Sequence, residues 1–174
     1  INSTSGNPIS AGIHNAGPAL SLLNTTVSGN TNNRVTGGSA FGGGMGSIVA
    51  STITITDSSF TGNSSTSQAG GFGFGAGLYL ESAFNVNATN SSFNNNTGSG
   101  TSGSNGTGAR VLSNAIGAVF SATNCTFNGN TGATGTANQG VGLQFFTTTA
   151  ADNTLTVTLD RVTVNGNTGN STAG

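Results

Sequence analysis

Few side chains in this sequence could carry acid–base chemistry or hold a metal ion. The carboxylates are Asp57, Glu81, Asp152 and Asp160, the cations are Arg34, Arg110 and Arg161, and the chain has one histidine, His14, and one cysteine, Cys125. A single histidine excludes a two-histidine metal site, and a single cysteine excludes both an internal disulfide and a cysteine-based zinc site. The chemistry left to consider is hydrolysis of a polysaccharide by a pair of carboxylates, which must lie about 5 to 9.5 Å apart.

The elements that would have to position these groups belong to a chain with very little charge. Charged residues make up 4% of the sequence, against about 25% in an ordinary soluble domain. Without a basic stripe we expect no nucleic-acid partner, and without a long apolar run we expect no membrane span. The chain begins at Ile1 rather than Met, which we interpret as a processed or excised protein. The low charge disfavours a freely dissolved monomer and favours a polymer or attachment to a surface, so we predict an extracellular or cell-surface location.

An eight-residue phrase, DSSFTGNS at residues 57–64, occurs five times with small changes. Its apolar residue is Val27, Phe60, Phe93, Phe127 or Val164, and an asparagine follows three residues later, at Asn30, Asn63, Asn96, Asn130 or Asn167. A second mark, a glycine-rich step before an apolar residue, recurs with the same period and ends at Ile13, Met45, Leu78, Val111 and Leu143. Two marks that keep one period near 33 residues predict a repeat architecture.

The residues before each phrase alternate between apolar and polar side chains. Two apolar columns precede the phrase, one formed by Leu22, Ile55, Ala88, Ala122 and Leu159 and the other by Leu20, Ile53, Val86, Phe120 and Val157. Alternation with a period of two predicts strands with one buried face, and the β-branched residues disfavour helix.

Strands that recur at one point of a constant repeat stack in parallel on their counterparts. We therefore predict an all-β fold, a right-handed parallel β-helix of about five rungs. Residues 1–174 would form a single domain, either by itself or as a slice of a longer solenoid, with rungs at roughly 8–33, 37–66, 70–99, 106–131 and 138–170. The glycine-, serine- and asparagine-rich segments, such as residues 70–77 and 97–108, are interpreted as tight crossings.

The repeated asparagines are predicted to form a structural ladder along the β-helix. An asparagine side chain can hydrogen-bond to the same side chain one rung above and below. Asparagine also tolerates the left-handed region of backbone conformation, so we expect both it and the preceding residue of the phrase to turn the corner of the coil.

This architecture separates the acidic residues. Asp57 and Asp160 lie three rungs apart, hence roughly 14 Å at a rung spacing of about 4.8 Å, which is too far for the carboxylate pair of a glycosidase. We therefore predict that the protein is not an enzyme and has no catalytic residue, metal or cofactor. His14 is expected to be outward-facing, and Cys125 to be buried and inert.

Sequons for N-glycosylation occur along the whole chain. Those that fall on outward columns or in irregular segments are candidate glycan sites, namely Asn2, Asn87, Asn95, Asn105 and Asn170. Glycans would be attached only in a eukaryotic secretory pathway.

The pairing of a glycine-rich step with an FxxN phrase resembles the repeat of the chlamydial polymorphic outer-membrane proteins. It is carried by GAGL with FNNN, GGGM with FTGN and GARV with FNGN, while the first and last copies have valine in place of phenylalanine. The resemblance implies a right-handed β-helix of the pectin-lyase-like kind, displayed outside the cell for adhesion or as a scaffold.

The leading functional prediction is a structural subunit of an extracellular or cell-surface fibre. A β-helix exposes strand edges at both ends, which natural solenoids cover with polar caps, and no such cap is evident in the sequence. The expected partner is therefore a second copy of the chain, stacked end to end. The main alternative is an adhesin or carbohydrate-binding passenger domain that uses Tyr79 as an exposed aromatic contact. A polysaccharide-active enzyme and an ice-binding protein are weaker alternatives.

Overall fold

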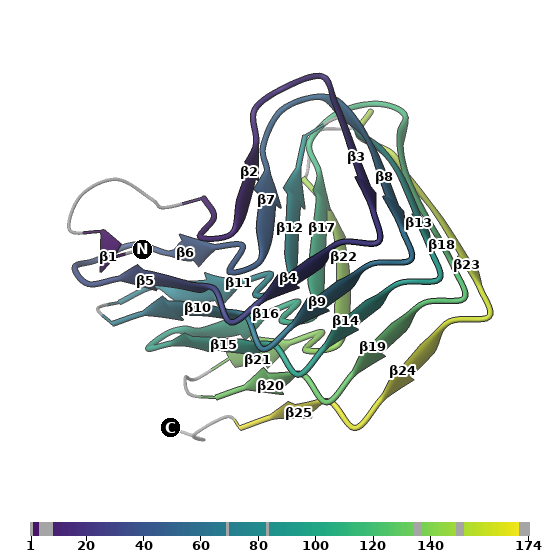
Figure 1. Ribbon diagram of the computed structural model, residues 1–174. Coiled ribbons are helices and arrows are strands. Elements are labelled where there is room, and N and C mark those ends of the chain that lie inside the picture. Colours follow the sequence, from purple (N-terminus) through teal and green to yellow (C-terminus); the bar gives the residue numbers. More distant parts are fainter. Residues whose placement is uncertain are drawn as a thin grey trace.

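The computed structural model describes residues 2–3, 9–68, 70–82, 84–133, 137–148 and 152–170, and these ranges contain strands and turns without any helix. Every strand pair is parallel and joins equivalent segments of successive turns, such as Asn85–Thr89 with Val119–Thr123. Figure 1 shows the resulting stack of coils. The prediction of an all-β parallel β-helix with about five turns and a period near 33 residues is confirmed.

Five strands occur in the same order in each full turn and form five parallel sheets, named here A to E. Sheet B contains β2 (Ile13–Asn15), β7 (Met45–Ser47), β12 (Leu78–Glu81), β17 (Ala109–Ser113) and β22 (Leu143–Thr147). Sheet C contains β3 (Ala19–Leu23), β8 (Ser51–Thr56), β13 (Phe84–Thr89), β18 (Ala118–Thr123) and β23 (Leu155–Asp160). Sheet D contains β4 (Thr26–Ser28), β9 (Ser59–Thr61), β14 (Ser92–Asn94), β19 (Thr126–Asn128) and β24 (Thr163–Asn165).

The two remaining sheets are made of the polar and glycine-rich segments that follow each phrase. Sheet A contains β1 (Asn2–Ser3), β5 (Thr31–Arg34), β10 (Ser64–Ser67), β15 (Thr97–Gly100), β20 (Thr131–Gly132) and β25 (Thr168–Gly169). Sheet E contains β6 (Ala40–Phe41), β11 (Phe72–Phe74), β16 (Gly103–Asn105) and β21 (Ala137–Gln139). In Figure 1 sheets A and E form an arm that projects to the left of sheets B, C and D.

The apolar columns of the sequence fill the space between sheets B, C and D. In sheet C, Val86 pairs with Ile53 on one side and with Phe120 on the other, and all three are fully buried. The phenylalanines of the phrase stack along the axis, with ring centroids 5.0 Å apart for Phe60 and Phe93 and 4.8 Å apart for Phe93 and Phe127. Burial of these side chains is the main stabilising contribution to the fold.

The register of the fourth glycine-rich step differs from the prediction. Leu78 pairs with Ala109, and Leu80 pairs with Val111, so the fourth member of this column is Ala109 rather than Val111. Both Ala109 and Val111 are fully buried. The prediction failed because two alternate residues of β17 face the core, and the larger one was taken as the equivalent of Leu78.

The interpretation of the glycine-rich segments as crossings without strands was wrong, because residues 70–77 contain β11 and residues 97–108 contain β15 and β16. Strands of sheet E lie against strands of sheet A, with β11 in contact with both β10 and β15. A Cβ atom at Gly73 would lie 2.3 Å from the carbonyl oxygen of Ser65. Glycine is needed here because the two backbones approach too closely for any side chain.

Left-handed backbone conformation occurs at the residue before each ladder asparagine and not at the ladder asparagine itself. The φ angles of Gly62 and Asn95 are 63° and 55°. The first residue of each phrase is left-handed as well, with φ angles between 48° and 53° at Asn24, Asp57, Asn90, Asn124 and Arg161. These two columns turn the chain from sheet D to A and from sheet C to D.

Candidate functional site

The predicted asparagine ladder occupies the inner corner between sheets D and A. Asn63 illustrates its geometry, because its Nδ2 donates to Asn96 Oδ1 at 3.1 Å and to the carbonyl oxygen of Val27 at 2.9 Å. Its Oδ1 accepts from both the backbone N–H and the Nδ2 of Asn30, at 3.1 and 3.0 Å. The same contacts link Asn96 with Asn130 and Asn130 with Asn167.

The ladder amides inside the stack are fully satisfied and fully buried, with Asn63, Asn96 and Asn130 all 0% exposed. Each makes two donations and two acceptances through its side chain, which is all that the buried amide requires. The ladder therefore fixes the vertical register of the turns.

The glycine column of the second repeat mark packs directly against this ladder. A Cβ atom at Gly77 would lie 2.8 Å from Asn96 Nδ2 and 2.4 Å from the carbonyl oxygen of Gly108. Equivalent close approaches occur for Gly12, Gly44, Gly108 and Gly142, each against the ladder asparagine of its own rung. The two marks of the repeat thus form one structural unit. This contact between them was not predicted from the sequence.

The inner ladder has a direction, which leaves different groups at its two ends. In every step the backbone N–H and Nδ2 of one rung donate to Oδ1 of the next rung toward the C-terminus. Within the described residues, Asn30 Oδ1 has no donor at the N-terminal end, and the Asn167 backbone N–H has no acceptor at the C-terminal end. One end of the ladder offers an acceptor and the other offers donors.

The last turn exposes side chains that are core residues in every inner turn. Val157 is 37% exposed, Leu159 45% and Val164 50%. Their equivalents one turn earlier are fully buried, namely Phe120, Ala122 and Phe127. In the first turn Leu20 and Leu22 are half-buried. Among the described residues nothing covers the core at the C-terminal end, so this end presents a contiguous apolar surface.

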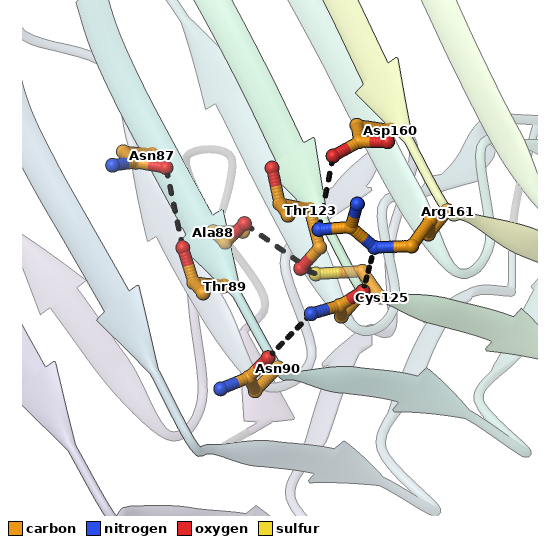
Figure 2. A network of polar contacts seen from close by, with 9 residues as sticks. Asn87, Ala88, Thr89, Asn90, Thr123, Cys125, Asp160 and Arg161 are labelled. Atoms are coloured by element: carbon orange, nitrogen blue, oxygen red, sulfur yellow. Dashed lines mark hydrogen bonds and ion pairs between the residues drawn. The ribbon is translucent and has the colours of Figure 1, made fainter.

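A second ladder runs along the outside of the corner between sheets C and D. Asn90 Nδ2 donates to Asp57 Oδ1 at 3.0 Å, and Asn124 Nδ2 donates to Asn90 Oδ1 at 3.0 Å. Arg161 Nε then donates to Asn124 Oδ1 at 2.5 Å, and the guanidinium pairs with Asp160 at 3.1 Å. The column begins with the acceptor-only Asp57 and ends with the donor-only Arg161. Figure 2 shows its part from Asn90 to Arg161.

The remaining chemically active side chains are dispersed. Asp57 takes part in the outer ladder, Glu81 accepts from the Tyr79 hydroxyl, and His14 is exposed on the outer face of sheet B. Within the described ranges no three histidine, cysteine, aspartate or glutamate side chains lie close enough to hold a metal ion together.

Cys125 lies under the outer ladder and is fully buried. Its thiol lies 3.5 Å from the carbonyl oxygen of Ala88 and 3.4 Å from that of Thr123, contacts that Figure 2 also shows. Burial raises the pKa of this thiol, since the thiolate would lose its hydration. A buried neutral thiol is a poor nucleophile.

Tyr79 does not lie where the adhesin alternative requires it. Its side chain is 2% exposed and packs against Phe41, with ring centroids 4.8 Å apart, so the expectation of an exposed aromatic contact was wrong. Its hydroxyl donates to Glu81 Oε2 at 2.5 Å, and burial together with this hydrogen bond raises the pKa of Tyr79 far above its ordinary value. The outward column of sheet B that holds Tyr79 also holds Arg110, which lies 3.9 Å above the ring of Phe74.

Three of the five candidate glycan sites are exposed in the structure. Asn87 lies on the outer face of sheet C, Asn95 follows β14, and Asn170 follows β25. Asn105 was expected in an irregular segment, which was wrong, because it belongs to β16 of the arm and its side chain is buried. The side chain of Asn2 lies outside the described residues.

Comparison with known proteins gave no match, whether to a family model, to a curated protein or to a solved structure. The likeness to the polymorphic outer-membrane protein repeat therefore stays a prediction. No helix with the length and apolar character of a membrane span occurs in the described part of the chain.

Proposed function

We propose that the protein is a structural subunit of an extracellular or cell-surface fibre, built by head-to-tail stacking of β-helices. The observation that carries this proposal is the complementarity of the two ends. Asn167 offers donors where Asn30 of a following copy would offer its free Oδ1, so the inner ladder would continue across the junction with the same contacts as within the chain.

The apolar columns support the same arrangement. Continuation of the stack would place Val164 on Val27 of the next copy, Leu159 on Leu22 and Val157 on Leu20, because these residues occupy the same columns. Aliphatic side chains would meet aliphatic side chains in all three columns. The exposed apolar area of the last turn would then be removed from water, which favours association.

The strand edges supply the remaining contacts. The last strands of sheets B, C, D and A present unpaired backbone groups to one side, and the first strands of sheets B, C and D present theirs to the other. In sheet A, β1 already pairs with Asn33 and Arg34 of β5, so the next copy would meet β5 at Thr31 and Asn32. Parallel strands of equal direction can pair across such a junction, whereas an antiparallel junction would break the ladder. The assembly is therefore polar, with each interface heterologous and open to further addition.

The low charge of the chain favours a polymer over a freely dissolved monomer, and sugars at Asn87 and Asn95 would keep the sides of the fibre hydrated. These two sites leave the ends of the stack clear, whereas Asn170 lies beside β25 in the last turn. A glycan there would limit growth at the C-terminal end, so we expect Asn170 to be unmodified in the assembled fibre.

Substitution of one core residue at the open end tests the proposal. Leu159→Lys places a charge in the junction, whereas Thr158→Lys adds the same charge to the outer face of the same strand. We expect the natural chain and Thr158→Lys to form concentration-dependent assemblies in sedimentation velocity, and Leu159→Lys to stay monomeric. A natural chain that is monomeric at all concentrations, or a Leu159→Lys variant that assembles like it, would contradict the proposal.

A further inference from the structure

A pocket lies on the outside of the β-helix, where the arm meets sheet B. It has a volume of about 180 Å³ and is lined by Ile9, Phe41, Ile48, Tyr79 and Glu81. None of these residues belongs to the apolar ends of the stack described above.

The pocket lies beside the outward column of sheet B, in which one residue has no side chain. This column reads His14, Gly46, Tyr79, Arg110 and Gln144 from the first turn to the last. At Gly46 the backbone of Ile9 approaches instead, and a Cβ atom there would lie 2.4 Å from the Ile9 carbonyl oxygen. Ile9 therefore takes the place of a side chain at Gly46 and forms one wall of the pocket beside Tyr79.

The walls of the hollow are apolar and aromatic. Phe41 and Tyr79 meet at an interplanar angle of 59°, so the two rings form an angled pair rather than a flat stack. Ile9 and Ile48 supply the aliphatic walls, and Ile48 is 40% exposed at the rim. A pocket of this kind favours a ligand with methyl or methylene groups.

Glu81 is the one charged group of the lining. The Tyr79 hydroxyl donates to its Oε2, which fixes the carboxylate at the pocket wall, and within the described residues Glu81 forms no ion pair. The nearest cation of the outward column, Arg110, is directed onto the ring of Phe74 at 3.9 Å. The carboxylate is therefore held beside two aromatic rings with its charge not neutralised by direct contact.

We propose that this pocket binds a small organic cation with apolar substituents, of the methylated or alkyl ammonium class. A carboxylate and aromatic rings attract such a cation together, while its alkyl groups contact the isoleucines. A neutral sugar fits this lining less well, because a sugar presents several hydroxyl groups and the lining offers polar atoms on Tyr79 and Glu81 alone. The proposal does not depend on the fibre, since the pocket lies on the side wall.

A matched pair of probes tests the role of charge in the natural chain. Choline and 3,3-dimethylbutan-1-ol have nearly the same shape, and only choline is charged. We expect titration calorimetry to show choline binding, with the neutral analogue at least about tenfold weaker. NMR shifts of Phe41 and Tyr79 on addition of choline would place the ligand in the pocket.

Two variants with the same loss of negative charge locate the effect. Glu81→Gln keeps a hydrogen-bond acceptor for Tyr79 but removes the charge, and we expect it to weaken choline binding about tenfold or more. Asp57→Asn makes the same change in the outer ladder and is expected to bind choline like the natural chain. Equal binding of choline to both variants would overturn the proposal.

Other outcomes are equally decisive. Equal affinity for choline and the neutral analogue would show an apolar pocket without charge recognition, and binding of methyl glucoside without choline would show a sugar site. Absence of choline binding at about 50 mM probe would also overturn the proposal. If Glu81→Gln does not fold, the probe pair on the natural chain still decides between these results.

Discussion

Replacement of Asn96 by alanine removes the centre of the inner ladder. Asn96 Oδ1 accepts from the backbone N–H and Nδ2 of Asn63 at 3.0 and 3.1 Å, and its Nδ2 donates to Asn130 Oδ1 and to the Phe60 carbonyl oxygen, both at 3.1 Å. Truncation leaves two buried N–H donors of Asn63 without an acceptor. Since each buried donor without a partner costs about 1–3 kcal/mol, we expect the free energy of unfolding to fall by about 4 kcal/mol.

The same substitution at the end of the ladder is the internal control. Asn30→Ala removes contacts at Asn63 and Ser28, but the backbone N–H of residue 30 still donates to Asn63 Oδ1, so no buried donor is orphaned. We expect a loss of about 1 kcal/mol there. Asn87→Ala, on the exposed face of sheet C, is expected to change stability by less than about 0.5 kcal/mol.

Urea unfolding followed by far-UV circular dichroism measures these differences. All variants should carry Leu159→Lys as well, because assembly would otherwise make apparent stability depend on concentration. The predicted order of loss is Asn96→Ala, then Asn30→Ala, then Asn87→Ala. Equal losses for Asn96→Ala and Asn30→Ala would refute the argument that buried amide satisfaction holds the turns in register.

Three further substitutions probe the packing. Gly77→Ala should lower the free energy of unfolding in urea by about 3 kcal/mol, because its Cβ would lie 2.4 Å from the Gly108 carbonyl oxygen. Gly62→Ala, in open space at a φ of 63°, should lower it by about 1 kcal/mol. Similar losses for both would contradict the close-packing argument. Phe93→Ala should cost about 3–5 kcal/mol by opening a cavity in the ring stack, and a loss below about 1 kcal/mol would show that the stack contributes little. The pKa of Cys125 is raised in the folded state, which means that folding favours the neutral thiol. The contribution of this thiol to the free energy of unfolding is therefore complete below the ordinary pKa of 9.0. It is lost as the pH rises above that value, because the thiol then ionises more readily in the unfolded chain. Unfolding at about pH 8 and about pH 10 should therefore show a smaller fall in stability for Cys125→Ala than for the natural chain, and an equal fall would contradict this assignment.

The sequence predicted the parts of the fold that depend on apolar alternation. The columns through Ile53 and Ile55 were assigned to the correct strand and the correct face, and their partners in the adjacent turns pair in the predicted register. Alternation is informative there because sheet C buries one face completely. The error at Val111 arose where two buried residues alternate in one strand and both satisfy the pattern.

Sheets A and E could not be predicted by the same reasoning, because their interior is not apolar. The facing positions hold small residues such as Ser65, Gly73 and Ser104, all of which are buried. In a sequence this rich in glycine and serine, such strands have no hydrophobic period and look like loops. The close approach of the two backbones stabilises them, and that is a tertiary feature.

The pocket was also missed for identifiable reasons. Only Met45 of β7 was assigned to a column, so the missing side chain of Gly46 on the outer face was not considered. Tyr79 alternates with core residues and was expected to be exposed, whereas Phe41 of the arm packs against its ring. A comparison of the outward column of sheet B across the turns would have marked both Gly46 and Tyr79 as exceptions.

Cryo-electron microscopy of the protein at high concentration tests the proposed assembly most directly. Head-to-tail stacking of five rungs predicts polar filaments with an axial repeat of about 24 Å per subunit, in which β25 of one copy lies beside Thr31 and Asn32 of β5 in the next, the part of β5 outside its pairing with β1. Particles without an axial repeat, or paired copies joined end to end with opposite polarity, would contradict the account.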